Sequence, residues 1–443
     1  MKMIFHFGKY QKTILCLFLA ITSLKSQDYQ QLKLKDAIEI GLNNNKNIKI
    51  SHLKQHISKT KEKDLKMEKL PDVNFHTSIS RVADLMQYES GYNNKPTKYE
   101  IYDAMYDFTL DASIPIYKGG KIRNTEKKAE IDTEITKLKT KLDERQLKMQ
   151  IITAYLQIHH LKEQEDLLKD KMREDSANIH ETKLLKKNGL VTNNEVLRTE
   201  LQLSNHKMTM TELENDVLIA EHKLKTLLSL PEEQELHVDT ENLLSEDSKI
   251  PYLEELISTA FTQDENLKIA KKNIHLKQLD KKIVRANWLP TISVSGEYFL
   301  KYPNYMFFPP TNHAYRFGMV GLHLNYPIEN LYKNKYRMQD AKEMIELAKL
   351  EVEEREENLR HDVFTSHKKF EETEQKVIIA EKAIEQAKEN YRIVTMKYAN
   401  KLSLITELID ADNAYLEARS NLISVKINRQ LKYYQLQYTI GNL

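Results

Sequence analysis

Two pairs of histidines are the residues of this sequence whose type and spacing come closest to a chemical site. His52 and His56 stand four residues apart, so on a helix both imidazoles would lie on one face, as in a two-histidine metal site. The glutamate that follows the first histidine in an HExxH motif is missing, and no third ligand clusters nearby. His159 and His160 are adjacent and would therefore face different sides of a helix, so we expect them to be surface and wall residues. We therefore predict no metal site.

Motifs of catalysis are also missing from the sequence. It contains no serine nucleophile elbow, no phosphate-binding P-loop and no paired carboxylates at catalytic spacing. We expect no catalytic residue and no cofactor, so the protein is not predicted to be an enzyme. An enzyme that used the histidine pair would instead lose its turnover when His52 or His56 is changed.

The composition indicates long helices. Ten Gly and ten Pro are few for 443 residues, since average usage is about 7% Gly and 5% Pro. Helix interiors exclude both residues, and 30% of the chain is charged. These values favour extended, solvent-exposed helices and disfavour a Rossmann-type enzyme, a β-sandwich or a collagen-like fibre. A hydrophobic content of 40% lies above the range of disordered chains.

The first 26 residues form a segment of a different class. Three lysines precede the apolar run 13–24, and Ser26 supplies a small residue for cleavage. This layout predicts a signal peptide over 1–26, because about 12 apolar residues are too few to span a bilayer. The only cysteine, Cys16, lies inside the apolar run. We therefore expect cleavage near Ser26, no lipoprotein anchor and a mature chain without disulfides.

The charge balance disfavours nucleic acid as a partner. Removing residues 1–26 takes away four lysines and changes the formal charge from +2 to −2. A nearly neutral chain gives no basis for binding to phosphate backbones. No other stretch approaches the roughly 18 apolar residues of a transmembrane helix. A membrane role would therefore have to come from strands.

The chain contains two copies of one plan. Leu34 matches Leu253 at a separation of 219, and Pro115 matches Pro327 at a separation of 212. Several other positions keep these same two separations. The seven-residue shift falls before Pro115, where a surface loop could absorb it. We predict a first structural repeat, 27–230, a linker, 231–252, and a second repeat, 253–443.

Each copy is predicted to run helix, strand, loop, strand and then a long helical hairpin. The first helix should run over 35–69 and end at a Leu-Pro pair. Alternating apolar and polar residues predict strands at 72–84, 102–116, 291–301 and 315–328, with loops at 85–99 and 302–313. Apolar residues at three- and four-residue steps predict helical hairpins at 119–230 and 333–440.

The four predicted strands could belong to a membrane barrel or to a soluble sheet. Their lengths match the roughly 9–11 residues of a tilted transmembrane strand. Strands in lipid must close into a barrel, and about eight are needed, so several chains would have to combine theirs. The alternative is a soluble sheet with one wet face, which produces the same alternation. The protein would then be a soluble periplasmic coiled-coil adaptor or a structural protein.

Several short motifs recur in a fixed order from about Leu32 to Asn442. Their order, spacing and duplication resemble those of the TolC-like outer-membrane efflux proteins. The motifs are Leu70-Pro71 and Leu289-Pro290 before strands, Pro115–Gly120 leading into a helix with Ala129, Asn188–Val191 followed by Glu195–Leu197, and the closing Ile440-Gly441.

The resemblance implies a mainly α fold with a small β part, built from a duplicated unit of helix, two strands and a long helical hairpin. It also implies a homotrimer, whose twelve-stranded outer-membrane β-barrel continues into a periplasmic α-helical barrel. Such a protein is the exit duct of a tripartite export system for drugs, small molecules or secreted proteins. Its partners would be a periplasmic adaptor, an inner-membrane pump and outer-membrane lipid, and much of it would lie in the periplasm.

The resemblance places the periplasmic mouth of the duct at the two hairpin turns. The turn residues are Asn188 and Gly189 in the first copy and Asn400 and Lys401 in the second. Lys401 stands where the family has glycine. Its neighbour Asn400 is a residue type that adopts a positive φ more readily than most.

The family carries acidic residues at this mouth, which map onto Glu195, Glu407 and Asp410. Three copies of each acid around a symmetry axis would favour cations and repel anions. The alternative is that they are ordinary solvated acids near helix N-termini, where the helix dipole stabilises them.

Overall fold

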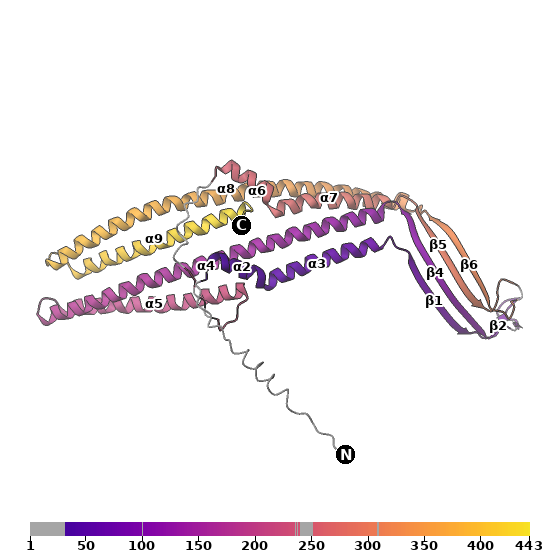
Figure 1. Ribbon diagram of the computed structural model, residues 1–443, viewed down its shortest axis with the longest axis horizontal. Helices are drawn as coiled ribbons and strands as arrows, with labels where there is room; N and C mark the ends of the chain where they lie inside the picture. The colour runs from indigo at the N-terminus through magenta and orange to yellow at the C-terminus, as the bar shows by residue number, and fades with distance from the viewer. Residues whose placement is uncertain (1–31, 100, 235, 237, 240–250, 308–309) are drawn as a thin grey trace, which may run out of the picture. The chain divides into compact units, whose positions relative to one another are not determined.

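The computed structural model describes residues 32–99, 101–234, 236, 238–239, 251–307 and 310–443 (Figure 1). The expected signal peptide, 1–26, and part of the expected linker lie outside the described residues. The chain forms two compact units. Unit 1 contains residues up to 45, 147–249 and 370–434, and unit 2 contains 46–146, 250–369 and 435–443. Each unit therefore takes segments from both repeats, and the repeat boundaries themselves remain a prediction.

The expected order of elements occurs twice, which confirms the duplicated, mainly α fold. The first copy comprises α2 (Leu34–Asn44), α3 (Lys46–Met67), β1 (Asp72–Arg81), β4 (Ala104–Lys118), α4 (Lys121–Lys187) and α5 (Asn193–Leu228). The second copy comprises α6 (Leu253–Gln263), α7 (Glu265–Ala286), β5 (Thr291–Tyr302), β6 (Tyr315–Asn325), α8 (Asn330–Ala399) and α9 (Ile405–Thr439). Among the described residues, no helix combines the length and apolar character needed to cross a bilayer.

The prediction of one continuous helix over 35–69 was wrong. The helix is interrupted at Asn45, whose φ of −58° and ψ of 130° are not helical. The Asn45 side chain is buried and donates a hydrogen bond of 2.8 Å to the carbonyl oxygen of Leu227. Asp264, 219 residues later, interrupts the second copy in the same way, with φ −58° and ψ 120°. Short polar side chains bond to nearby or facing backbone and so compete with the helix.

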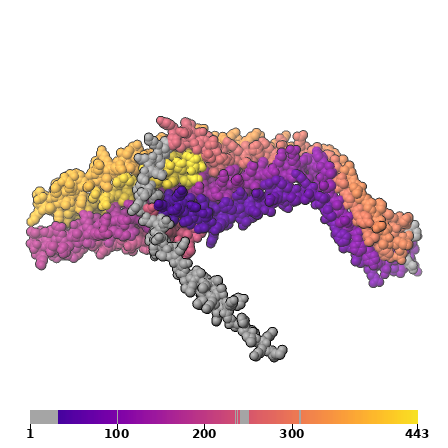
Figure 2. Space-filling model, in the orientation of Figure 1, coloured from indigo at the N-terminus to yellow at the C-terminus, as the bar shows by residue number. Residues whose placement is uncertain are grey.

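The main sheet has the strand order β1-β4-β5-β6, and every pair is antiparallel. Figures 1 and 2 show β1, in purple, and β6, in orange, at opposite edges of this sheet. A short second hairpin, β2 (Leu85–Gln87) with β3 (Thr97–Tyr99), occupies the segment that we expected to be a loop. Its three-residue strands are too short to give the alternation by which strands are recognised.

The two faces of the main sheet differ in character. One face carries exposed apolar side chains from edge to edge, among them Val73, Phe75, Leu110, Tyr298, Leu300, Val320, Leu322 and Leu324. The other face carries charged pairs: His76 lies 3.1 Å from Asp111, and Lys301 lies 3.1 Å from Asp107. The alternation in the sequence therefore produces a sheet whose apolar face no described residue covers.

The core of unit 1 forms where α2 meets the long helices. Gly41 of α2 lies so close to α4 that an added Cβ would be 2.3 Å from a methyl group of Ile151. Tyr155 is buried beside this contact, and its hydroxyl lies 2.7 Å from the carbonyl oxygen of Leu32 and 2.8 Å from that of Asp239. Backbone ahead of α2 is thereby fixed to backbone that follows α5.

The core of unit 2 is an apolar cluster from four helices. It consists of Leu256, Ile257, Ala260 and Leu267 from α6 and α7, Val352, Leu359 and Val363 from α8, Leu436 from α9, and Ile440 directly after α9. Full burial of each such leucine, isoleucine or valine contributes about 1.5–3 kcal/mol.

Two different turns connect the strands of unit 2 to the long helices. Gly119 has a φ of +62°, and an added Cβ would lie 2.9 Å from the carbonyl oxygen of Ala286, so glycine is required for this close approach. The second copy uses side-chain hydrogen bonds instead. Asn330 donates to the carbonyl oxygen of Asn287 at 3.0 Å, and Asn334 donates to that of Val284 at 2.9 Å.

Candidate gate at the hairpin turns

The first hairpin turn closes with a left-handed residue. Gly189 has a φ of +73°. Its amide donates to the carbonyl oxygen of Lys186 at 2.9 Å, and the amide of Leu190 donates to that of Leu185 at 2.9 Å. These two bonds form a Schellman motif, in which the left-handed position favours glycine.

The second hairpin turn repeats these bonds 212 residues later. The amide of Lys401 donates to the carbonyl oxygen of Tyr398 at 2.9 Å, and the amide of Leu402 donates to that of Lys397 at 2.8 Å. Lys401 itself takes the left-handed conformation, with a φ of +61°. The positive φ therefore falls on Lys401, the position equivalent to Gly189, and not on Asn400. Asn400 directly follows the end of α8; its amide donates to the carbonyl oxygen of Met396 at 3.2 Å, and its side chain donates to the same oxygen at 2.8 Å.

Glu195 lies in the first turn of α5 and joins two helices. Its carboxylate accepts a hydrogen bond from the backbone amide of Thr192 at 3.4 Å and another from the hydroxyl of Tyr398, near the end of α8, at 3.2 Å. Burial, together with the negative charge of Glu195, raises the pKa of Tyr398 to about 12. The phenol therefore stays protonated and keeps donating at neutral pH.

Glu407 and Asp410 lie one turn apart near the start of α9, and both are exposed. Glu407 accepts a hydrogen bond from Ser403, while Asp410 forms no hydrogen bond or ion pair with the part of the chain that the structure describes. The three expected gate acids thus all belong to the turn ends of the hairpins in unit 1. The structure leaves the two α9 carboxylates accessible from outside the chain.

A cavity of about 470 Å³ lies between the two hairpin turns, within unit 1. Glu195, Tyr398 and Lys401 line it together with apolar side chains of α9 such as Leu408. The turn ends of the hairpins are therefore joined by a few polar contacts around an open space, and not by a continuous apolar core.

Sequence reasoning missed a buried ionic cluster behind this cavity. The Lys171 side chain is only 4% exposed, and its ammonium nitrogen lies 2.6 Å from Asp412 Oδ1 and 3.5 Å from Asp175 Oδ1. Burial alone would lower the pKa of Lys171, but the hydrogen bonds and negative charges of Asp412 and Glu174 together outweigh it, and the pKa is raised. Burial raises the pKa of Asp412, against the opposing effect of Lys171.

Further contacts extend the cluster to every helix of the two hairpins. His206 of α5 lies 2.6 Å from Asp175 of α4, and Gln202 of α5 donates to Asp412 of α9 at 3.1 Å. Tyr391 of α8 donates to Glu174 of α4 at 2.7 Å. One signal for the cluster exists in the sequence, since Lys171 follows two buried leucines at helical spacing and so occupies a core position.

The structure places the histidines of the two pairs in different surroundings. His52 lies 3.5 Å from a carboxylate oxygen of Glu144, and no group of three metal-binding side chains converges among the described residues. His160 lies 2.9 Å from the hydroxyl of Ser424. His159 is 1% exposed, so its expected place on the surface or wall was wrong, because its side of α4 faces the core.

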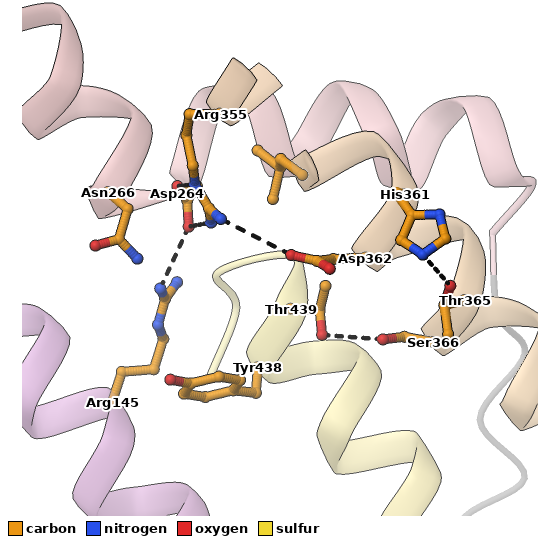
Figure 3. Close-up of a pocket in the computed structure, with 11 residues that line it drawn as sticks. Arg145, Asp264, Asn266, Arg355, His361, Asp362, Thr365, Ser366, Tyr438 and Thr439 are labelled. Atoms are coloured by element: carbon orange, nitrogen blue, oxygen red, sulfur yellow. Dashed lines mark hydrogen bonds and ion pairs between the residues drawn. The ribbon is translucent and has the colours of Figure 1, made fainter. Parts of the chain in front are cut away.

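A second polar cavity, of about 260 Å³, lies in unit 2 at the interruption between α6 and α7 (Figure 3). Asp264 is 2% exposed, caps α7 by accepting the amide of Leu267 at 2.7 Å, and lies 3.1 Å from Arg355. Arg145 approaches it to 3.6 Å, and its guanidinium also lies 2.8 Å from Glu265. The charges balance one another, so this cluster holds the helix interruption in place.

The fold matches known channel structures. The outer membrane protein VceC of Vibrio cholerae superposes with a TM-score of 0.75 at 13% identity, over 92% of this chain and 96% of that chain. The CmeC outer membrane channel of Campylobacter jejuni gives 0.77 at 14% identity, over 92% and 85%. The open state of the MtrE outer membrane channel of Neisseria gonorrhoeae gives 0.74 at 17% identity, over 92% and 88%.

A family model for outer membrane efflux proteins matches the chain twice, over residues 42–229 and 256–442. No curated protein sequence matches the chain. The two matched segments cover most of the chain and follow its two copies, which confirms the expected resemblance. The chain belongs to the outer membrane efflux protein family.

Proposed function

We propose that the protein is a passive outer-membrane exit duct of a tripartite export system. It would carry drugs, small molecules or secreted proteins from a periplasm-spanning pump to the exterior. The observation that carries the proposal is the main sheet of unit 2, which combines an exposed apolar face with two edge strands that have no partner among the described residues. Family membership favours this role over that of a soluble adaptor, and the family is one of channels, not of enzymes.

Three copies of the chain would complete the barrel. In lipid, the unpaired backbone groups of an edge strand must find partners. Pairing β6 of one copy with β1 of the next, three times over, gives twelve strands and leaves no edge. The apolar face, with Val320, Leu322 and Leu324 of β6 and Val73 and Phe75 of β1, would then contact outer-membrane lipid.

The energy for export would come from partners. The sequence has no P-loop, so an inner-membrane pump would drive transport through a periplasmic adaptor. Residues 1–26 would direct the chain through the inner membrane and be cleaved near Ser26. The α-helical part would remain in the periplasm without a lipid anchor.

The hairpin turns would form the periplasmic gate. Three copies of Glu407 and Asp410 around the axis would select for cations, and Glu195 would hold α8 through Tyr398. The turn residues Asn188, Gly189, Asn400 and Lys401 would surround the mouth.

Two neighbouring residues of β6 test the membrane assignment. Leu322 lies on the apolar face and is 70% exposed, while His323 lies on the other face. Arginine facing lipid at the bilayer midplane costs about 2–4 kcal/mol. We expect Leu322→Arg to reduce the amount of trimer extracted from the outer-membrane fraction, whereas His323→Arg should leave it near the wild-type amount. Recovery of the wild-type protein as a water-soluble monomer would contradict the proposal.

A further inference from the structure

Basic side chains are concentrated where the helices of unit 2 join the main sheet. The end of α3, the start of α4, the end of α7 and the start of α8 each adjoin a strand. Over residues 59–69, 118–128, 277–285 and 329–342 the sequence has 18 Lys and Arg against 7 Asp and Glu. The whole chain is nearly balanced, with 67 against 65. We name these four segments the basic collar.

Much of this positive charge has no partner. Several collar side chains form no hydrogen bond or ion pair with any described residue; among them are Lys121, Arg123, Lys127, Lys282, Arg285, Arg337 and Lys342. Four of the seven acids of the collar already pair with its lysines; Glu126, for example, lies 2.6 Å from Lys69, and Asp280 lies 2.6 Å from Lys128. The excess charge is therefore available to an external anion.

The helix dipoles add to the same positive field. The long helices α4 and α8 both begin in the collar, and neither has an acidic residue in its first turn. Lys121 and Arg123 instead stand in the first turn of α4. Cations are unfavourable at a helix N-terminus, where anions are stabilised. An external phosphate at the start of α4 would be stabilised both by the helix dipole and by these basic side chains.

A groove within unit 2 combines this charge with apolar surface. It lies between α7 and α8 and has a volume of about 900 Å³. Lys281, Lys282, Arg285, Lys342 and Lys349 line it beside three apolar side chains of α8, and only Glu343 and Glu346 oppose them. Such a groove is suited to a molecule that carries both a phosphate group and hydrocarbon.

We propose that the basic collar binds the phosphate groups of anionic phospholipids in the membrane leaflet that faces the helices. The proposal rests on the proposed function, because only a sheet inside the membrane brings these helix ends against that leaflet. A lipid surface fits better than a single soluble anion because the excess charge occurs at all four helix–strand junctions. Clusters of Lys and Arg next to a membrane-spanning segment bind anionic headgroups in this way.

The test compares lipids of different headgroup charge on the full-length trimer. The wild-type trimer in detergent is titrated with phosphatidylglycerol or with phosphatidylcholine. Scanning calorimetry measures the midpoint of thermal unfolding, and native mass spectrometry counts the lipids that the trimer retains. We expect phosphatidylglycerol alone to raise the midpoint and to be retained. The increase should be lost at about 1 M salt, where the screening length falls to about 3 Å.

Variants with equal charge changes locate the effect. The collar variant carries Lys121→Gln, Arg123→Gln, Lys282→Gln and Arg285→Gln. The control carries Lys207→Gln, Lys382→Gln, Lys388→Gln and Lys397→Gln, which are exposed residues of unit 1. The collar variant should need about tenfold more phosphatidylglycerol for half of the wild-type midpoint shift, and the control should need no more than the wild type.

Three results would overturn the proposal: an equal shift with both lipids, an undiminished shift in the collar variant, or the same shift with inorganic phosphate at matched concentration. The last would indicate a free-anion site instead of a lipid surface. Conductance in neutral phosphatidylcholine bilayers separates the two proposals. If the wild type and both variants conduct in these bilayers but the titrations show no preference for phosphatidylglycerol, the lipid proposal is contradicted and the proposed function is not.

Discussion

The Tyr398 hydroxyl donates a 3.2 Å hydrogen bond to Glu195 and thereby joins the end of α8 to the start of α5. It crosses from one helical hairpin to the other beside the cavity at the turns. The expected gate acid Glu195 is therefore also a structural contact between hairpins, while Glu407 and Asp410 remain exposed.

Removal of the Tyr398 hydroxyl should loosen this link. We expect Tyr398→Phe to lower stability by about 0.5–1.5 kcal/mol, the usual contribution of one hydrogen bond, and to raise the mean single-channel conductance. Tyr391→Phe is the matched control, because it removes a tyrosine–glutamate bond that lies farther from the turns. A conductance change of the same size in both variants would contradict a specific role for the Glu195 contact.

The left-handed lysine at the second turn should be a site of strain. Lys401→Gly is expected to raise the free energy of unfolding by about 1 kcal/mol, because a side chain at positive φ costs about 1–2 kcal/mol. Gly189→Lys, the reciprocal change at the equivalent position, should lower it by a similar amount. Urea unfolding of the two variants measures both effects. Changes of the same sign in the free energy of unfolding would contradict the equivalence of the turns.

The buried Lys171–Asp412 pair should behave as a coupled unit. Lys171→Met leaves the Asp412 carboxylate buried without its ammonium partner, which costs about 3–5 kcal/mol. The double variant Lys171→Met with Asp412→Leu replaces both charges with apolar groups and should recover most of that loss. A double-mutant cycle on unfolding free energies tests the coupling, and simple additivity would show that the pair acts as two independent residues.

The buried His159 should make the protein sensitive to acid. Burial, with a smaller effect of the adjacent His160, lowers the pKa of His159. Below about pH 6.5 the unfolded chain therefore binds a proton that the folded chain does not, and stability falls as the pH falls. His159→Leu should reduce this loss between pH 7.5 and pH 5 and should also raise stability at neutral pH, because both ring nitrogens lack hydrogen-bond partners among the described residues.

The duplication and the four strands of the main sheet could be predicted from the sequence. The duplication shows as constant separations between the two copies, and the strands show as alternation within a short window. The sequence does not reveal the interruptions at Asn45 and Asp264. Neither position is a proline or glycine, and each interruption depends on a distant partner, Leu227 for the first and Arg355 for the second.

The site was predictable only in part, because much of it also depends on contacts between residues that are distant in the sequence. The turn positions follow from the repeat, but the left-handed residue had to be located from the backbone, which places it at Lys401 and not at Asn400. Most of the Lys171 cluster depends on contacts between residues more than 200 positions apart. Helical spacing indicates that Lys171 occupies a core position, but it does not identify these distant partners.

Single-channel recording of the purified trimer in a planar phosphatidylcholine bilayer tests the central claim, an outer-membrane duct with acids at its mouth, most directly. The account predicts discrete, cation-selective conductance steps that a trivalent cation blocks from the side of the helices. Glu407→Gln with Asp410→Asn should weaken both the selectivity and the block while the trimer remains intact. Absence of conductance steps would contradict the duct, and an unchanged block in the double variant would contradict the assignment of Glu407 and Asp410 to its gate.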